Sequence, residues 1–150
     1  MNIIGAFDRS RASELEPRAN SVLICITSES SKHPKLNKKW LEILYLKFDD
    51  VEGREAEIGS AANVMQDKHA EQILDFAVKH IDKDLFINCD AGLSRSPGVL
   101  VALEQIFNGR DLSEDYRFHN KFVKNKIRDI WFKRIWFGRE KDDEDAGEED

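Results

Sequence analysis

The stretch Asp84-Leu-Phe-Ile-Asn-Cys-Asp-Ala-Gly-Leu-Ser-Arg-Ser-Pro-Gly98 decides the fold of this 150-residue chain. Its first part, up to Cys89, is short and apolar and is typical of a buried strand, whereas the residues from Pro97 onward have the composition of a helix start. At such a junction the free backbone N–H groups of the loop and the first helical turn point at one spot, which carries the positive end of the helix dipole. We therefore expect an anion to bind there.

Glycine, serine and proline mark the turn and the ends of this helix. Gly92 lies in the middle of the loop, where a missing Cβ permits left-handed dihedrals and close approach of a ligand to the backbone. Ser96 is predicted to be the N-cap, which would put Pro97 at the first helical position, where the missing N–H is harmless. Gly109 is predicted to end the helix.

Two side chains of the loop could act on a bound phosphate. A thiolate at Cys89, the nucleophilic form, would be stabilised by the loop amides and by the guanidinium of Arg95. The planar fork of Arg95 can bind two phosphoryl oxygens at once. Cys89 could then attack phosphorus in line with the leaving oxygen and form a covalent thiophosphate, which water would hydrolyse in a second step.

Cys89, Gly92, Arg95 and Ser96 resemble the signature loop of the cysteine-dependent protein tyrosine phosphatase superfamily. The chain is similar to the small dual-specificity type, because the loop lies in the second half of the chain rather than near the N-terminus, as in low-molecular-weight tyrosine phosphatases. The resemblance implies an α/β fold, with a mostly parallel central sheet of four to five strands flanked by helices. It also implies that phosphate is bound by the loop residues Asp90, Ala91, Gly92, Leu93, Ser94 and Arg95.

The reaction needs a general acid, because neither a thiolate nor an arginine can supply the proton that the leaving oxygen takes. We predict Asp50, which follows the strand-like run Leu44–Phe48 and would lie just past its end, where open α/β sheets place their sites. The segment Leu46–Val51 is similar to the one that bears the acid in this family, and the family pattern favours the second of the two adjacent acids. Spacing alone leaves Asp49 open as the rival.

Four further residues of the predicted site follow or depart from the family pattern. Asn88 stands where the family usually has His; its carboxamide could orient neighbouring backbone groups, but it adds no positive charge, so we expect a less stabilised thiolate. Asp90 is an unfavourable charge near the sulfur unless its side chain points away. The resemblance implies that Ser96, in competition with its capping role, helps the thiolate leave, and that Asn120 supports the site.

The remaining apolar segments predict the rest of the sheet and its crossover. Their near-continuous hydrophobicity favours a mostly parallel, covered sheet. The predicted strands are Asn2–Phe7, Ser21–Thr27, Leu41–Phe48 and Leu85–Cys89. Helical spacing between Ala70 and Ile81 predicts a crossover helix with Asp67 as its cap. Cys25 is predicted to be a core strand residue, and residues 53–60 an exposed loop around the acid.

A basic and aromatic helix is predicted over 118–137, followed by an acidic tail. One stripe of the helix is expected to join the core: Phe122, Val123, Ile127, Ile130 and Trp131. We expect four further apolar side chains to pack within the chain, with a dimer or partner contact as the alternative; these are Phe132, Ile135, Trp136 and Phe137. Residues 1–138 are predicted to form one phosphatase-like domain and residues 139–150 a disordered tail.

Bulk properties narrow the class of protein. The net charge of −6 disfavours nucleic acid as a partner, and two Cys without an apolar leader or a long apolar span favour the cytoplasm and no membrane. No metal or cofactor is expected, because the histidines lack metal-ligand spacing. These are His33, His69, His80 and His119.

The predicted activity is hydrolysis of phosphotyrosine in a protein or peptide, with phosphoserine and phosphothreonine as further candidates, because the loop contains no Lys of the kind that phosphoinositide-selective relatives carry. Two alternatives remain. One is a catalytically weak phosphate-binding pseudophosphatase or interaction module. The other is rhodanese-like sulfur or arsenate chemistry on a similar cysteine loop.

Overall fold

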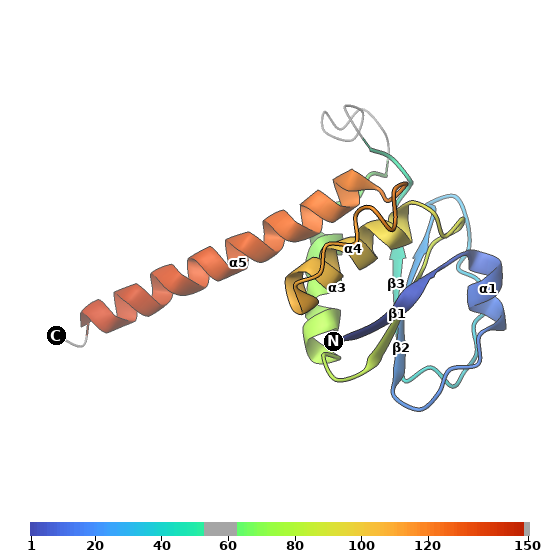
Figure 1. The fold of residues 1–150 in the computed structure, drawn as a ribbon, viewed down its shortest axis with the longest axis horizontal. Helices are drawn as coiled ribbons and strands as arrows, with labels where there is room; N and C mark the ends of the chain where they lie inside the picture. Colours follow the sequence, from blue (N-terminus) through green and yellow to red (C-terminus); the bar gives the residue numbers. More distant parts are fainter. Residues whose placement is uncertain (53–62, 149–150) are drawn as a thin grey trace.

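Four parallel strands form the sheet of the computed structural model, which describes residues 1–52 and 63–148, with side chains as far as residue 138. The strands lie in the order β1-β4-β2-β3, so that β4 is central between β1 and β2 (Figure 1). Their bounds are β1 Asn2–Phe7, β2 Ser21–Thr27, β3 Glu42–Lys47 and β4 Asp84–Asn88. The predicted α/β class and parallel sheet are confirmed, and all four predicted strands are present.

Helices cover both faces of this sheet, and the hydrophobic core is larger on one face than on the other. Helix α1, Arg9–Glu14, lies on one face, and α3, Asp67–Lys79, with α4, Arg95–Asn108, and α5, Lys121–Glu148, on the other (Figure 1). Side chains alternate along β2. Ile24 therefore joins the main core with the three long helices, whereas Cys25 packs with Leu23 and Trp40 beneath α1. The prediction that Cys25 is a core residue is confirmed.

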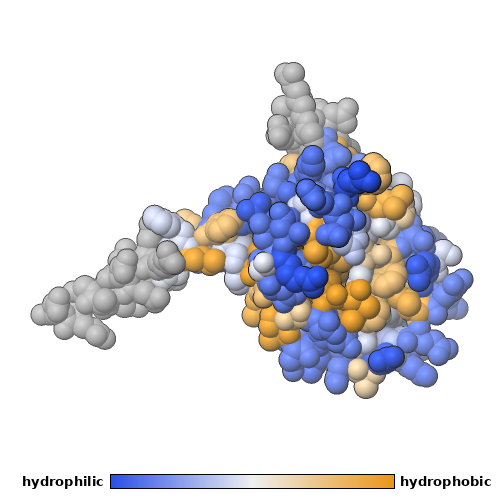
Figure 2. All heavy atoms as spheres, in the orientation of Figure 1, coloured by the Kyte–Doolittle hydropathy of each residue, from blue (hydrophilic) through white to orange (hydrophobic). Residues whose placement is uncertain are grey.

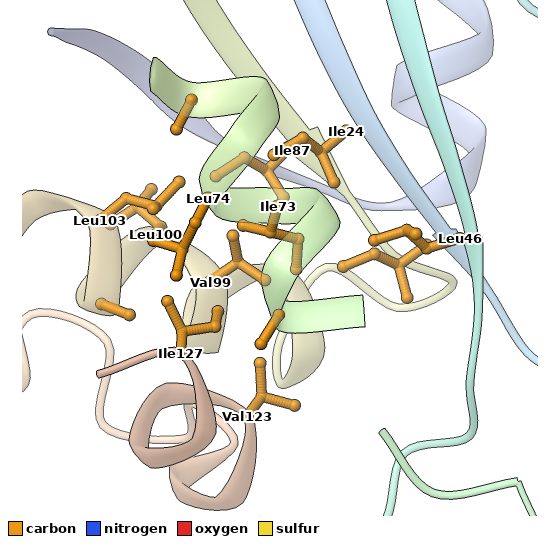
Figure 3. Packing of buried hydrophobic residues seen from close by; sticks show 14 of the residues in the cluster. Ile24, Leu46, Ile73, Leu74, Ile87, Val99, Leu100, Leu103, Val123 and Ile127 are labelled. Carbon is orange, nitrogen blue, oxygen red and sulfur yellow. The ribbon is translucent and has the colours of Figure 1, made fainter. Parts of the chain in front are cut away.

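The main core ties the strand that precedes the loop to the helix that follows it. Figure 3 shows Ile87 of β4 in one cluster with Leu74 of α3, Val99 of α4 and Ile127 of α5. All four side chains are fully buried. Because interiors pack at close to crystal density, this contact holds β4 and α4 in a defined relation, and the loop between them starts and ends on rigid elements.

Helix α3 follows the predicted spacing, but its N-cap lies one residue before the predicted one. Gln66, not Asp67, is the N-cap: its side chain accepts from the N3 backbone, and the Nδ1 atom of His69 accepts from the Gln66 N–H at 2.9 Å. Asp67 instead lies in the first turn and binds Lys126 of α5 at 2.8 Å. The capping prediction for Asp67 is therefore wrong, because Gln and His together complete the capping box.

Helix α5 packs on the core through one stripe and then extends beyond it. Val123, Ile127 and Ile130 are buried, and Phe122 and Trp131 pack against the core, as predicted. The four apolar residues that follow were predicted to pack within the chain, and this prediction is wrong because they are exposed. They are Phe132 (58%), Ile135 (39%), Trp136 (62%) and Phe137 (60%). They lie on the part of α5 that projects from the domain in Figure 1, and Figure 2 shows apolar surface there.

Helix α5 reaches Glu148 and so continues into the acidic segment, while the domain boundary at residue 138 stays a prediction. The predicted loop 53–60 lies outside the described residues. In the described ranges, no helix is both long enough and apolar enough to cross a lipid bilayer.

Candidate active site

The sulfur of Cys89 points toward a backbone amide of the loop between β4 and α4. Cys89 is almost completely buried at 1% exposure, and its backbone N–H donates to Phe7 O of β1 at 3.2 Å. Its Sγ atom accepts from the Gly92 N–H at 3.2 Å and lies 3.1 Å from Ser96 Oγ. A sulfur held by an amide and a hydroxyl at a helix start is placed where negative charge is stabilised.

Gly92 is required by the shape of the loop. Its φ of 72° lies in the left-handed region, as predicted. A Cβ at this position would lie 2.5 Å from Asp8 N and 2.7 Å from Phe7 C, because the loop packs directly against the end of β1. Only glycine fits both the dihedral and the contact.

The start of α4 differs from the predicted one by two residues. The helix begins at Arg95, and Ser94 occupies the N-cap position without a side-chain capping bond. Ser96 is therefore not the N-cap, and Pro97 is the third helical residue rather than the first. The physical reason is that both hydroxyls are bound elsewhere, Ser94 to Asp50 and Ser96 to Cys89. Gly109 ends the helix in the left-handed conformation (φ 63°), as predicted.

The guanidinium of Arg95 is buried and held along one edge. Its Nη1 donates to Phe48 O at 2.9 Å and to Ser28 Oγ at 3.1 Å, and its Nη2 donates to Asp90 Oδ2 at 3.0 Å. Ser28 Oγ also donates to Asp90 Oδ2 at 2.9 Å, so these contacts close a ring around the two terminal nitrogens. Nε is buried and has no hydrogen-bond partner among the described residues. Nε–H and the second N–H of Nη2 thus have no acceptor among the described residues, and two neighbouring N–H groups are what a bidentate acceptor binds.

Asp90 points toward Arg95 rather than into solvent. Its Oδ2 atom also accepts from the Ser28 N–H at 3.3 Å, and its Oδ1 lies 3.6 Å from Arg9 Nη1. Burial would raise the pKa of the Asp90 carboxyl, but the hydrogen bonds from Ser28 and Arg95 and the guanidinium charge outweigh burial and hold that pKa below its ordinary value. The carboxylate therefore offsets part of the positive charge around the loop.

The structure brings Asp50 and Asn120 together at the same loop. Asp50 Oδ1 accepts from Ser94 Oγ at 2.7 Å and from Asn120 Nδ2 at 2.9 Å. The Asn120 amide also donates to Val51 O at 3.1 Å, and its backbone N–H donates to Ser94 O at 2.8 Å. Asn120 is completely buried, so it can fix the segment that carries Asp50 against the loop.

Asp49 makes its hydrogen bonds to other residues than Asp50 does. Its Oδ1 atom accepts from the Glu29 N–H at 3.0 Å, and its own N–H donates to Asn63 O at 2.8 Å. These bonds join the ends of β2 and β3 to the segment before α3. Of the two adjacent acids, Asp50 is the one hydrogen-bonded to the residues around the sulfur.

Asn88 does not perform the orienting role that the sequence suggested. It is 1% exposed, and no N–H or C=O group of the described residues bonds to its carboxamide. It lies opposite Cys25 in the pairing of β2 and β4, and burial raises the pKa of that thiol.

Three contacts of the site were not predicted from the sequence: the Ser28 hydroxyl, the Phe48 carbonyl and the Ser94 hydroxyl on Asp50. Ser28 and Phe48 follow β2 and β3 directly, as Cys89 follows β4. The carboxyl ends of adjacent parallel strands meet at one edge, so the position of Ser28 just past β2 places it near the site without naming its partner, whereas the Phe48 contact is made by a backbone carbonyl and has no signal in the sequence.

A cavity of about 320 Å³ lies beside the loop, lined by Gly92, Leu93, Pro97 and residues 115–118. Leu93 and Phe118 are exposed at 65% and 79%, so they present apolar surface next to the predicted phosphate-binding residues.

Comparisons with known proteins show a distant structural likeness. No protein-family model matches the chain, and no curated protein matches it. The chain is similar to the crystal structure of a human tyrosine phosphatase-like serine/threonine/tyrosine-interacting protein, with a TM-score of 0.45 and 19% identity, covering 78% of each chain.

Proposed function

We propose that this chain is a cysteine-dependent phosphomonoesterase that hydrolyses phosphotyrosine in proteins or peptides. The observation that carries the proposal is the hydrogen bond of 2.7 Å between Ser94 and Asp50, because it links an acid from the end of β3 to the loop that holds the Cys89 sulfur. A nucleophile and a proton donor on one loop are the two groups that phosphoester cleavage needs.

The first step would transfer the phosphoryl group to sulfur. The Cys89 thiolate forms an S–P bond while the bond from phosphorus to the leaving oxygen breaks. The free edge of Arg95 and the loop amides bind the equatorial oxygens, where charge must be stabilised in transit. Asp50 gives its proton to the leaving oxygen, so that tyrosine departs as a neutral phenol.

The second step would return the enzyme to its starting state. Asp50, now a carboxylate, takes a proton from water as that water attacks phosphorus. The S–P bond breaks and the electron pair returns to Cys89. Ser96 Oγ, 3.1 Å from the sulfur, can donate a hydrogen bond to the departing thiolate.

The test compares wild type with Cys89→Ser on an aryl phosphate and on a panel of phosphopeptides. We expect turnover and a trapped cysteinyl phosphate in the wild type and neither in the variant. Equal rates for both proteins would refute the mechanism.

A phosphate-binding module without turnover is the second candidate. The near-complete burial of Cys89 and the Asp90 carboxylate beside Arg95 favour it, because both lower the reactivity expected of the loop. Binding of vanadate without hydrolysis of any aryl phosphate would select this function. Rhodanese-like sulfur chemistry is less well supported, since it assigns no role to Asp50 or to its bonds with Ser94 and Asn120.

A further inference from the structure

Arg95 is held by residues that follow three neighbouring strands. Ser28 follows β2, Phe48 follows β3 and Asp90 lies two residues past β4, and these strands are adjacent in the order β4-β2-β3. Each contributes one acceptor to the guanidinium. The anchor therefore depends on the alignment of three strand ends, which the sheet provides.

We infer that Asp90 and Ser28 are positioning residues, which hold Arg95 with its free edge presented to the phosphoryl group. The inference rests on the proposed function and adds two residues to it. Arginine has a long side chain with many rotamers, and binding an anion with a mobile guanidinium costs conformational entropy. A guanidinium already fixed on its terminal edge avoids that cost, which is the advantage of a preorganised site.

The ring of hydrogen bonds indicates that Asp90 positions Arg95 and does not compete with the substrate for it. Asp90 Oδ2 accepts from the Ser28 N–H, the Ser28 hydroxyl and Arg95 Nη2, so its acceptor capacity is taken up by the ring. These contacts occupy the terminal edge, while Nε, on the other edge, has no partner among the described residues. Phosphate can therefore bind Arg95 without displacing Asp90.

The experiment measures inorganic phosphate binding by the full chain with NMR, following the Nε–H resonance of arginine. We expect that signal of Arg95 to shift with phosphate in the wild type. Asp90→Ala and Ser28→Ala should each weaken the affinity about tenfold, as expected for loss of a hydrogen bond to a charged group. Asp90→Asn, which keeps an oxygen acceptor, should restore most of the affinity, a rescue that a merely structural role would not show.

Controls separate positioning from a general loss of structure. Asp75→Ala removes an Asp–Arg pair of similar length, 2.9 Å to Arg134, at a site remote from the loop, and should leave phosphate affinity unchanged. The double variant Asp90→Ala with Ser28→Ala should be no weaker than Asp90→Ala alone, because both substitutions open the same ring. Backbone amide spectra establish that each variant is folded.

The outcomes for this inference and for the proposed function are distinguishable. Unchanged phosphate affinity in Asp90→Ala would show that Asp90 does not position Arg95, and a higher affinity would show that Asp90 competes with the anion; either result would overturn the inference. Fully additive effects in the double variant would do the same. A wild type that binds phosphate but hydrolyses no aryl phosphate refutes the proposed hydrolase, while the binding data still decide the role of Asp90. A wild type that binds no phosphate overturns both.

Discussion

Replacing Asp50 by Asn tests the general acid with little change to the fold. The amide oxygen of the variant can still accept from Ser94 Oγ and Asn120 Nδ2, which both bind Oδ1 in the wild type at 2.7 and 2.9 Å. Among the described residues Oδ2 has no hydrogen-bond partner, so it is the oxygen available to carry the transferred proton. The free energy of unfolding should therefore change by less than about 0.5 kcal/mol, as at an ordinary surface site.

The effect on rate should depend on the leaving group. General acid catalysis typically contributes a factor of about 10² to 10⁴, which corresponds to roughly 3–5 kcal/mol of the activation barrier. We expect a loss of this size in kcat on a phosphotyrosine peptide, whose phenolate is a poor leaving group. On p-nitrophenyl phosphate the loss should be much smaller, because p-nitrophenolate leaves readily without a proton.

Steady-state assays of both substrates with Asp50→Asn and its matched control, Asp49→Asn, measure the difference. Asp49 Oδ1 accepts from the Glu29 N–H, and among the described residues the Asp49 side chain makes no hydrogen bond to the loop, so its variant should keep nearly full kcat. An equal, small loss on both substrates in Asp50→Asn would refute its role as acid. A larger loss in Asp49→Asn would move that role to Asp49.

Three further predictions concern the loop and the core. Gly92→Ala should destabilise the protein by about 2–4 kcal/mol and abolish turnover, because its Cβ would lie 2.5 Å from Asp8 N in a left-handed conformation; an unchanged melting temperature would contradict the required close approach. Ile127→Ala, at 0% exposure, should cost about 2–5 kcal/mol by leaving a cavity, seen as a lower Tm in calorimetry, whereas Phe132→Ala on the exposed part of α5 should cost little. The pKa of Asp90 is lower in the folded state, so its stabilising contribution is present above its ordinary pKa of about 3.9 and is lost as pH falls through the lower folded value. Asp90→Asn should therefore flatten the fall in Tm in acid, and parallel curves for variant and wild type would count against this linkage.

Local patterns predicted much of the sheet and the loop. The bounds of β1 and β2 agree with the predicted strands, because continuous apolar runs flanked by polar residues are typical of covered parallel strands. Gly92 was predicted from its place in the loop, since few residues can adopt a positive φ. The start of α4 was misplaced because the hydroxyl of Ser96 lies on the Cys89 sulfur instead of capping the helix, which begins at Arg95.

Contacts between residues far apart in the chain could not be predicted from local sequence patterns. Nothing in the run around Asp50 reveals that Ser94 and Asn120 bind its carboxylate, and nothing near Ser28 reveals Arg95. The exposure of Phe132 and Phe137 likewise depends on where α5 leaves the core.

The amino-acid sequence alone determined the α/β class, the strand positions and the choice of Cys89 and Arg95 as a candidate pair, because hydrophobic period and turn chemistry are local properties of a chain. Only the tertiary structure decided which edge of Arg95 is free and which of two adjacent acids lies on the loop. Those depend on parallel strands bringing their carboxyl ends to one edge, where side chains separated by tens of residues come within hydrogen-bond distance.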